Sequence, residues 1–169
     1  MSSDLKTLDS RLWCLFRSES ARFAVPLEAV VEIVAIDSLV ALPLGPPCLL
    51  GLCTFRREVI PVVRLRRDSL AERESPATKS AILVLRTEKG SWAFKIERDG
   101  VVVSEGTTDL DSTPRSDGLS LSSGLSISRG EAVYAAVDPE AAWIQVRACV
   151  ARGYGSGFQQ GQALDAHQN

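Results

Sequence analysis

The fold of this chain is decided by residues 49–67, which read Leu-Leu-Gly-Leu-Cys-Thr-Phe-Arg-Arg-Glu-Val-Ile-Pro-Val-Val-Arg-Leu-Arg-Arg. Two short apolar runs, 49–53 and 59–63, lie on either side of a polar step at 54–58. Short apolar runs separated by a charged step are typical of two strands joined by a tight turn. Because Pro61 has no backbone N–H, we predict that the second strand is an edge strand or carries a bulge.

Short apolar runs and turn residues continue on both sides of this hairpin. Further strands are predicted at 12–16, 22–27, 81–85, 92–96, 101–103, 125–127 and 132–137. Residues 28–34 mix helix and strand formers, and we predict a brief turn followed by a strand there. The Ser-, Thr-, Asp- and Gly-rich segment 105–124 predicts a long loop. Many short strands with few helices indicate an all-β fold, with about five strands in each half of the chain.

The two ends of the chain differ in character from the middle. Residues 1–10 are polar and are expected to be flexible, and the folded domain is expected to span 11–152. Asp138-Pro139 predicts the start of a helix, with Asp as the N-cap and Pro at the first helical position, and the helix is expected over 139–148. The Gly- and Gln-rich segment 153–169 offers little to bury and is predicted to be a disordered tail.

The overall charge excludes some classes of partner. The chain has 19 basic and 21 acidic side chains, a net charge of -2, which argues against electrostatic binding to nucleic acid or to an anionic membrane. No apolar run approaches the roughly 20 residues needed to cross a bilayer, so direct membrane insertion is not expected. The first residues lack the pattern of a secretion signal, and we expect a cytoplasmic protein.

The residues needed for catalysis are missing from the predicted folded part. The single histidine, His167, lies in the tail, and no phosphate-binding Gly-rich motif occurs. The four cysteines, Cys14, Cys48, Cys53 and Cys149, are scattered among apolar neighbours and are predicted to be reduced and buried. The sequence therefore predicts a protein that is not an enzyme and that binds no cofactor and no metal.

The hairpin also resembles a known family motif. Gly51-Leu52-Cys53-Thr54-Phe55-Arg56-Arg57, followed by Val59-Ile60-Pro61-Val62-Val63-Arg64-Leu65, is similar to Gly-x-x-x-Leu-Arg-Gly followed by Val/Ile-x-Pro-Val-Val-Asp-Leu. That motif is the signature of CheW-like domains, the receptor-coupling adaptors of bacterial chemosensory arrays. The likeness covers roughly residues 11–148. It implies two five-stranded SH3-like barrels packed on a shared core, the first over about 11–70 and the second over about 80–137, with a short C-terminal helix.

The resemblance implies an adaptor function. Such a protein would bind the cytoplasmic tip of a methyl-accepting chemoreceptor in the groove between the barrels. Other surfaces would bind the regulatory domain of a CheA-type histidine kinase. The alternative is a divergent CheW-like scaffold that has lost kinase coupling and serves a motility, pilus or other signalling complex. A nucleic-acid binder rests only on the arginines of the hairpin, and the acidic segment 97–117 argues against it.

The resemblance also points to candidate partner-binding residues. In the family, the Arg of the motif commonly pairs with the Glu of Val-x-Glu, and the matching residues are Arg56 and Glu32. This pair could brace a barrel or present a fixed face to a partner. Val30, the first residue of the Val-x-Glu match, belongs with Leu52, Phe55 and Val62 to an apolar stripe that could form core or groove.

Two signature positions carry an unexpected charge. Arg57 replaces the family's Gly, and Arg64 replaces its Asp, so each adds a positive charge where partners could bind. Thr54 and Phe55 replace the usual Asn and Leu, which are milder changes. We predict that Arg57 is exposed at the turn and that the stem of Arg64 runs along apolar surface. The hypothesis is that both arginines select a particular partner.

Overall fold

The structure, a computed structural model, describes residues 11–18, 21–36, 39–43, 48–64, 80–110, 122–148 and 150–151. The expected flexible segment 1–10 and tail 153–169 lie outside these residues. The strands and the single short 3-10 helix are β1 (Arg11–Ser18), β2 (Ala21–Pro26), η1 (Leu27–Ala29), β3 (Val30–Ala35), β4 (Leu49–Phe55), β5 (Glu58–Val63), β6 (Ser80–Thr87), β7 (Gly90–Glu97), β8 (Val102–Gly106), β9 (Asp109–Leu110), β10 (Ser122–Arg129) and β11 (Ala132–Val137). Residues 139–148 and 150–151 are helical.

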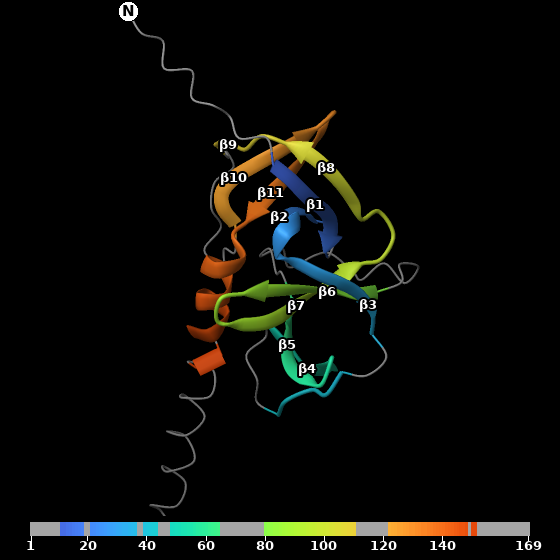
Figure 1. The fold of residues 1–169 in the computed structure, drawn as a ribbon, viewed down its shortest axis with the longest axis vertical. Helices are drawn as coiled ribbons and strands as arrows, with labels where there is room; N and C mark the ends of the chain where they lie inside the picture. Colours follow the sequence, from blue (N-terminus) through green and yellow to red (C-terminus); the bar gives the residue numbers. More distant parts are fainter. Residues whose placement is uncertain are drawn as a thin grey trace, which may run out of the picture.

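The strands form two sheets, and both the first and the last strands of the chain belong to the same sheet (Figure 1). We call the six-stranded sheet β8-β1-β2-β11-β10-β9 the terminal barrel and the five-stranded sheet β3-β6-β7-β5-β4 the central barrel. The predicted all-β fold of two SH3-like barrels on a shared core, with a short C-terminal helix, is confirmed. The sixth strand of the terminal barrel is β9, which has only two residues.

The predicted division of the strands at residues 70 to 80 is wrong. Residues 11–70 were expected to form one barrel and residues 80–137 the other, but β1 and β2 pair with β8 and β11, and β6 pairs with β3. The chain begins in the terminal barrel, builds the whole central barrel, and then returns. Local patterns identify strands but carry no information on pairing between strands that are distant in sequence.

The two barrels share one arrangement of five strands. In the terminal barrel an edge strand, β8, is followed by the hairpin β1–β2, a parallel junction to β11, and β10. In the central barrel the edge strand β3 is followed by the hairpin β6–β7, a parallel junction to β5, and β4. The five strands have the same order in space in both barrels, and the barrels differ only in which of these strands comes first along the chain. Val59 and Val133 therefore occupy equivalent outer positions on the hairpins β4–β5 and β10–β11.

The strands at the junction are buried on both faces, which explains their uninterrupted apolar sequences. From β6, Leu83 faces the core shared by the two barrels, whereas Ile82 and Val84 face the interior of the central barrel. From β1, Phe16 faces the shared core and Leu15 faces the interior of the terminal barrel. One layer of side chains therefore holds both barrels together.

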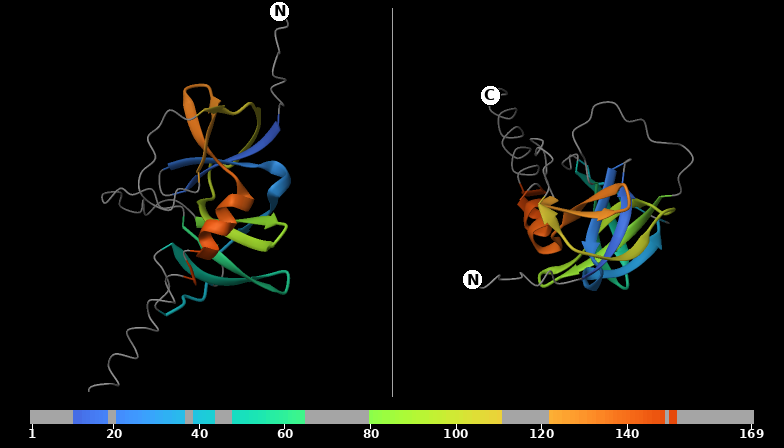
Figure 2. Two further views of the ribbon diagram at one scale, coloured as in Figure 1. Left: turned by 90° about the vertical axis from the view of Figure 1, so that its left-hand side faces the viewer. Right: turned by 90° about the horizontal axis from the view of Figure 1, so that it is seen from above.

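The C-terminal helix completes the shared core. The Oδ1 atom of Asp138 accepts hydrogen bonds from the backbone N–H groups of Glu140, at 2.9 Å, and Ala141, at 3.2 Å, which confirms the predicted N-cap. Trp143 stacks on Trp92 of β7 with ring centroids 5.9 Å apart. Figure 2 shows from two further directions that the helix lies at the junction of the two barrels.

Two local expectations are corrected by tertiary pairing. The strand that contains Pro61 is not at an edge, because β5 lies between β7 and β4; of the two predicted alternatives, only an irregularity is present, as a register shift in the β4–β5 pair between Leu49 and Gly51. Pro61 is tolerated because the pairing with β7 begins one residue later, at Val62, so at Pro61 the only neighbouring strand is β4. The segment 105–124, expected to be loop, contains the end of β8, all of β9 and the start of β10.

The shared core predicts that the two barrels unfold together. Truncating the fully buried Leu83 to Ala should lower the free energy of unfolding by about 2–5 kcal/mol, because it leaves a cavity that both barrels line. Chemical denaturation should show a single transition. The matched control is Val133→Ala at a 52% exposed position, expected to change stability by less than about 0.5 kcal/mol. Two separate transitions would contradict the shared core.

Candidate functional site: protein-binding surfaces of the two barrels

Two arginines form the turn of the hairpin β4–β5. Phe55 pairs with Glu58, so Arg56 and Arg57 are the two residues of the loop. Both have positive φ, 45° and 72°, the sign that a type I′ hairpin turn requires at both central positions. The turn therefore keeps a backbone conformation that favours Gly, although Arg57 is present, and its exposed side chain lies at the tip as predicted.

Arg56 joins the two edges of the central barrel. Its Nη2 atom lies 2.8 Å from Oε2 of Glu32, which confirms that the predicted pair is in contact. Glu32 is on β3 and Arg56 directly follows the last residue of β4, and these two strands are the opposite edges of the sheet. The guanidinium also lies 5.1 Å from the ring centroid of the buried Phe55. The contact thus links the two edges of the sheet, while the side chains of Arg56 and Glu32 remain 63% and 44% exposed.

An apolar surface covers the outer face of the same hairpin. Opposite residues in an antiparallel pair share a face, as do residues two apart in one strand. The pairs Leu52–Pro61, Thr54–Val59 and Leu52–Val40 therefore place five side chains on one face. We call this surface, Val40, Leu52, Thr54, Val59 and Pro61, the hairpin patch. Val40 and Val59 are 64% and 66% exposed.

Gly51 holds the segment that carries Val40 against β4. The backbone groups of Val40 and Leu52 exchange two hydrogen bonds of 2.9 Å. A Cβ atom at Gly51 would lie 2.4 Å from the carbonyl oxygen of Val40, so only glycine allows this approach. The first glycine of the hairpin motif therefore completes the hairpin patch.

The predicted apolar stripe does not form one surface. Phe55 and Val62 are buried in the core of the central barrel, whereas Leu52 belongs to the hairpin patch. Val30 is half-buried and packs against the shared core. The stripe mixes core and surface because the two faces of β4 and β5 are both apolar.

Arg64 lies away from the hairpin tip. It follows the last residue of β5, is half-buried, and donates its backbone N–H to the carbonyl oxygen of Cys48 at 2.8 Å. At about 3.3 Å per strand residue, Arg57 and Arg64 are separated by about 20 Å. The structure therefore does not bring these two charges together, while the neighbouring Arg66 and Arg67 lie outside the described residues.

Further apolar side chains remain exposed or half-buried on the segments that enclose the shared core, and sequence reasoning identified only one of them, Val30, as a candidate binding residue. Ile33 pairs with Leu83 and Val103 pairs with Cys14, so each lies on the face that encloses the shared core. We call Leu12, Val30, Ile33, Val101 and Val103 the seam surface. Leu12, Ile33 and Val103 are 45%, 39% and 53% exposed. Continuous apolar runs gave no sign of which residues remain exposed.

The described cysteines are buried or half-buried, as predicted. Cys14 and Cys48 are buried and Cys53 is half-buried, and burial raises the pKa of the Cys14 thiol to about 11. Burial also raises the pKa of Cys53. Thiols with raised pKa values stay protonated at neutral pH and react slowly.

Within the described ranges, no helix is both long and apolar enough to cross a membrane.

The described chain thus consists of two barrels on one core, with apolar side chains exposed on the hairpin β4–β5 and on the strands that enclose the shared core. The family model of the CheW-like domain matches residues 13–143. The chain therefore belongs to the CheW-like domain family.

A solved structure supports this fold. The scaffolding protein TtCheW from Thermoanaerobacter tengcongensis superimposes with a TM-score of 0.65 at 13% sequence identity, over 82% of this chain and 91% of that chain. No curated protein sequence matches this chain. At this sequence identity the likeness shows that the two proteins share a fold.

The ion pair predicts a small, measurable coupling between Glu32 and Arg56. In a double-mutant cycle with Glu32→Ala and Arg56→Ala, the coupling free energy should be about 0.2–1 kcal/mol, because solvent screens an exposed pair. Denaturant unfolding of the four proteins gives this value, and it should fall at high salt. Additive effects would show that the contact does not brace the barrel. The cycle Glu32→Ala with the distant Arg22→Ala serves as a control.

The turn predicts that Arg57→Gly stabilises the protein. A non-glycine residue in the left-handed region costs about 1–2 kcal/mol, and glycine removes this cost but loses more conformational entropy on folding. A net gain of about 0.5–1 kcal/mol is expected in thermal or denaturant unfolding. Arg57→Ala is the matched control, since Ala removes the charge but keeps the strain. Equal effects of Gly and Ala would show that charge, not backbone strain, determines stability at the tip.

Proposed function

We propose that this scaffold couples methyl-accepting chemoreceptors to a CheA-type histidine kinase, without catalytic activity of its own. The observation that carries the proposal is the hairpin patch beside the Arg56–Glu32 pair. A contiguous apolar surface on a folded domain indicates a protein-binding site. Here it is held in place by the core of the central barrel beneath it and by the ion pair at its edge.

The hairpin patch is the proposed site for the regulatory domain of the kinase. Val40, Leu52 and Val59 provide apolar contact area, and Thr54 provides a hydroxyl among them. Arg56 and Arg57 lie at one end of the patch and would form its charged rim. In such an interface the apolar centre supplies most of the affinity, and the rim charges set encounter rate and partner choice.

The seam surface is the proposed site for the receptor tip. A helical hairpin presents apolar residues at spacings of three and four, which fit an apolar groove. Leu12 and Val103 from the terminal barrel, and Ile33 from the central barrel, would contact such a helix from two sides. Because both sites lie on one rigid core, a receptor that shifts would move the bound kinase. Repeated weak contacts would add up through effective concentration.

A second candidate function follows from the charge at the tip. The exposed Arg57, at the rim of the hairpin patch, gives the surface a positive charge that favours an acidic partner. Arg64 would contribute only if the interface extends to the base of β5. Under this alternative the scaffold binds a dedicated partner in a motility, pilus or other signalling complex and excludes a general kinase.

Binding to a standard CheA-type regulatory domain tests the coupling function. Val59→Asp should weaken binding at least about tenfold, because it places a carboxylate on the apolar face of the patch. The matched control is Val133→Asp at the equivalent position of the hairpin β10–β11, expected to leave the affinity unchanged. Affinity is measured by titration calorimetry at low and moderate salt. Equal loss with both variants would contradict binding at the hairpin patch.

The double variant Arg57→Gly with Arg64→Asp separates the two candidates. If the arginines select a dedicated partner, this variant gains affinity for the standard kinase domain and loses affinity for the proteins that co-purify with the parent chain. If it binds both as the parent does, partner selection by these charges is wrong. Arg57→Gly alone shows whether the tip accounts for the effect without the base of β5.

A further inference from the structure

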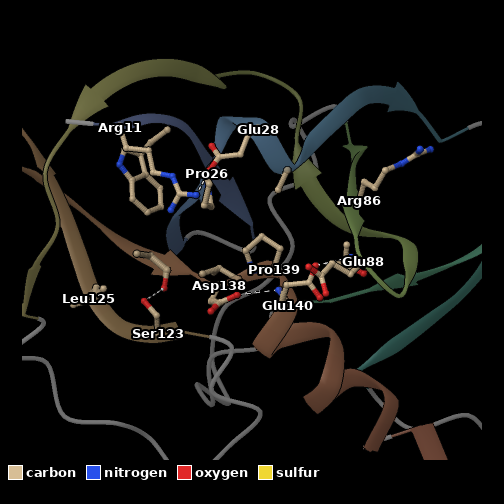
Figure 3. A pocket seen from close by; sticks show the side chains of 15 residues that line it. Arg11, Pro26, Glu28, Arg86, Glu88, Ser123, Leu125, Asp138, Pro139 and Glu140 are labelled. Atoms are coloured by element: carbon tan, nitrogen blue, oxygen red, sulfur yellow. Dashed lines mark hydrogen bonds and ion pairs between the residues drawn. The ribbon is translucent and has the colours of Figure 1, made fainter. Parts of the chain in front are cut away.

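A pocket opens at the end of the terminal barrel that faces the C-terminal helix, and none of its lining residues belongs to the hairpin patch (Figure 3). Its volume is about 610 Å³, within the range of about 300–1,000 Å³ that is typical of ligand pockets. It is lined by Arg11, Trp13, Pro26, Glu28, Ala29, Arg86, Thr87, Glu88, Ser123, Leu125, Ala136, Val137, Asp138, Pro139 and Glu140. The terminal barrel, the β6–β7 turn and the start of the helix therefore all contribute to it.

Apolar side chains from inside the barrel line part of the pocket. Trp13 and Ala136 belong to the core of the terminal barrel, and Leu125 packs against that core. The indole Nε1 of Trp13 donates a hydrogen bond to the carbonyl oxygen of Gly106 at 3.2 Å. Trp13 is only 5% exposed and the only polar atom of its ring already has a partner, so the small part of the ring that reaches the pocket is aromatic surface without an unmet hydrogen bond.

Three carboxylates line one wall of the pocket. Glu88, Asp138 and Glu140 lie together across the pocket from Arg11 and Glu28 (Figure 3). Glu140 accepts a hydrogen bond from the backbone N–H of Glu88 at 2.7 Å, which joins the β6–β7 turn to the helix. Within the described part of the chain, none of the three makes an ion pair.

The two arginines that line the pocket, Arg11 and Arg86, do not pair with these three carboxylates. The side chain of Arg86 points away from the carboxylates (Figure 3). Arg11 pairs with Glu28 on the opposite wall. The wall therefore keeps a net negative charge toward an incoming cation, although Oδ1 of Asp138 already accepts the two backbone N–H groups of the helix N-cap.

The chain's own Arg11 shows how this pocket holds a guanidinium. Its Cζ atom lies 5.6 Å from the centroid of the Trp13 ring, while the same group pairs with Glu28. A cation placed over an aromatic ring and beside a carboxylate is stabilised by both. The other end of the pocket offers carboxylates next to the same apolar lining.

We propose that this pocket binds a peptide segment of a partner protein that carries a lysine or arginine between apolar residues. The apolar residues would contact Trp13 and Leu125, and the cation would lie against the wall formed by Glu88, Asp138 and Glu140. Charge complementarity selects this occupant, because an acidic segment would face three carboxylates at close range. The pocket is separate from the hairpin patch, so this inference does not depend on the proposed coupling function.

Short peptides test the pocket directly. The probes are acetyl-Leu-Arg-Leu-amide and its Gln and Glu counterparts, titrated while the indole N–H resonances of the three tryptophans are followed by NMR. The Arg peptide should shift the Trp13 resonance and leave that of the fully buried Trp92 unchanged. The Glu peptide should bind at least about tenfold more weakly.

Matched charge variants locate the effect. Glu88→Gln removes one carboxylate of the wall and should weaken the Arg peptide about threefold, whereas Glu131→Gln, an exposed acid in the β10–β11 turn, should not. Moderate salt should weaken the Arg peptide in the parent protein. The proposal is overturned if Trp13 does not respond, if the Arg and Glu peptides bind equally, or if the two variants weaken binding equally.

Discussion

The structure depends on one layer of apolar packing between two sheets. Leu83, Trp92 and Phe94 from the central barrel meet Phe16 and Phe23 from the terminal barrel without solvent between them. The rings of Phe16 and Phe94 stack across this layer with centroids 6.0 Å apart. Neither barrel could expose this surface to water without a large loss of hydrophobic stabilisation. The two barrels therefore behave as one body, and every surface on one has a fixed position relative to the other.

Because the two barrels pack as one body, the exposed apolar residues have fixed positions. The hairpin patch and the seam surface both lie over well-packed cores, so their side chains are exposed although the backbone beneath them is held firmly. A scaffold that works by geometry needs such preformed surfaces, since ordering a flexible surface would cost affinity. The Arg56–Glu32 pair contributes to the same end at the edge of the hairpin patch, where it joins the first and last strands of the central barrel.

Backbone strain at the hairpin tip is confined to two residues that lie beside the hairpin patch. Arg56 and Arg57 both adopt positive φ in a turn where glycine would be less strained. The rest of the hairpin, with six paired positions from Leu49 to Phe55, determines this turn, so the chain retains it despite the side chains. An arginine at a strained, exposed position next to an apolar patch is the kind of feature that recognition of a partner can explain.

The sequence by itself determined most of the strands, though not β9, and the capped helix, because these follow from local periodicity and a capping aspartate. The hairpin motif and the resemblance that it carries pointed to the family and to the contact between Glu32 and Arg56. The sequence could not determine that β1 and β2 pair with the last strands, or that Pro61 lies in an internal strand, because both depend on pairing between distant segments. Nor could it identify most of the seam surface or the pocket. Where strands are buried on both faces, the apolar pattern is continuous, and only the packing of the two barrels decides which side chains remain exposed.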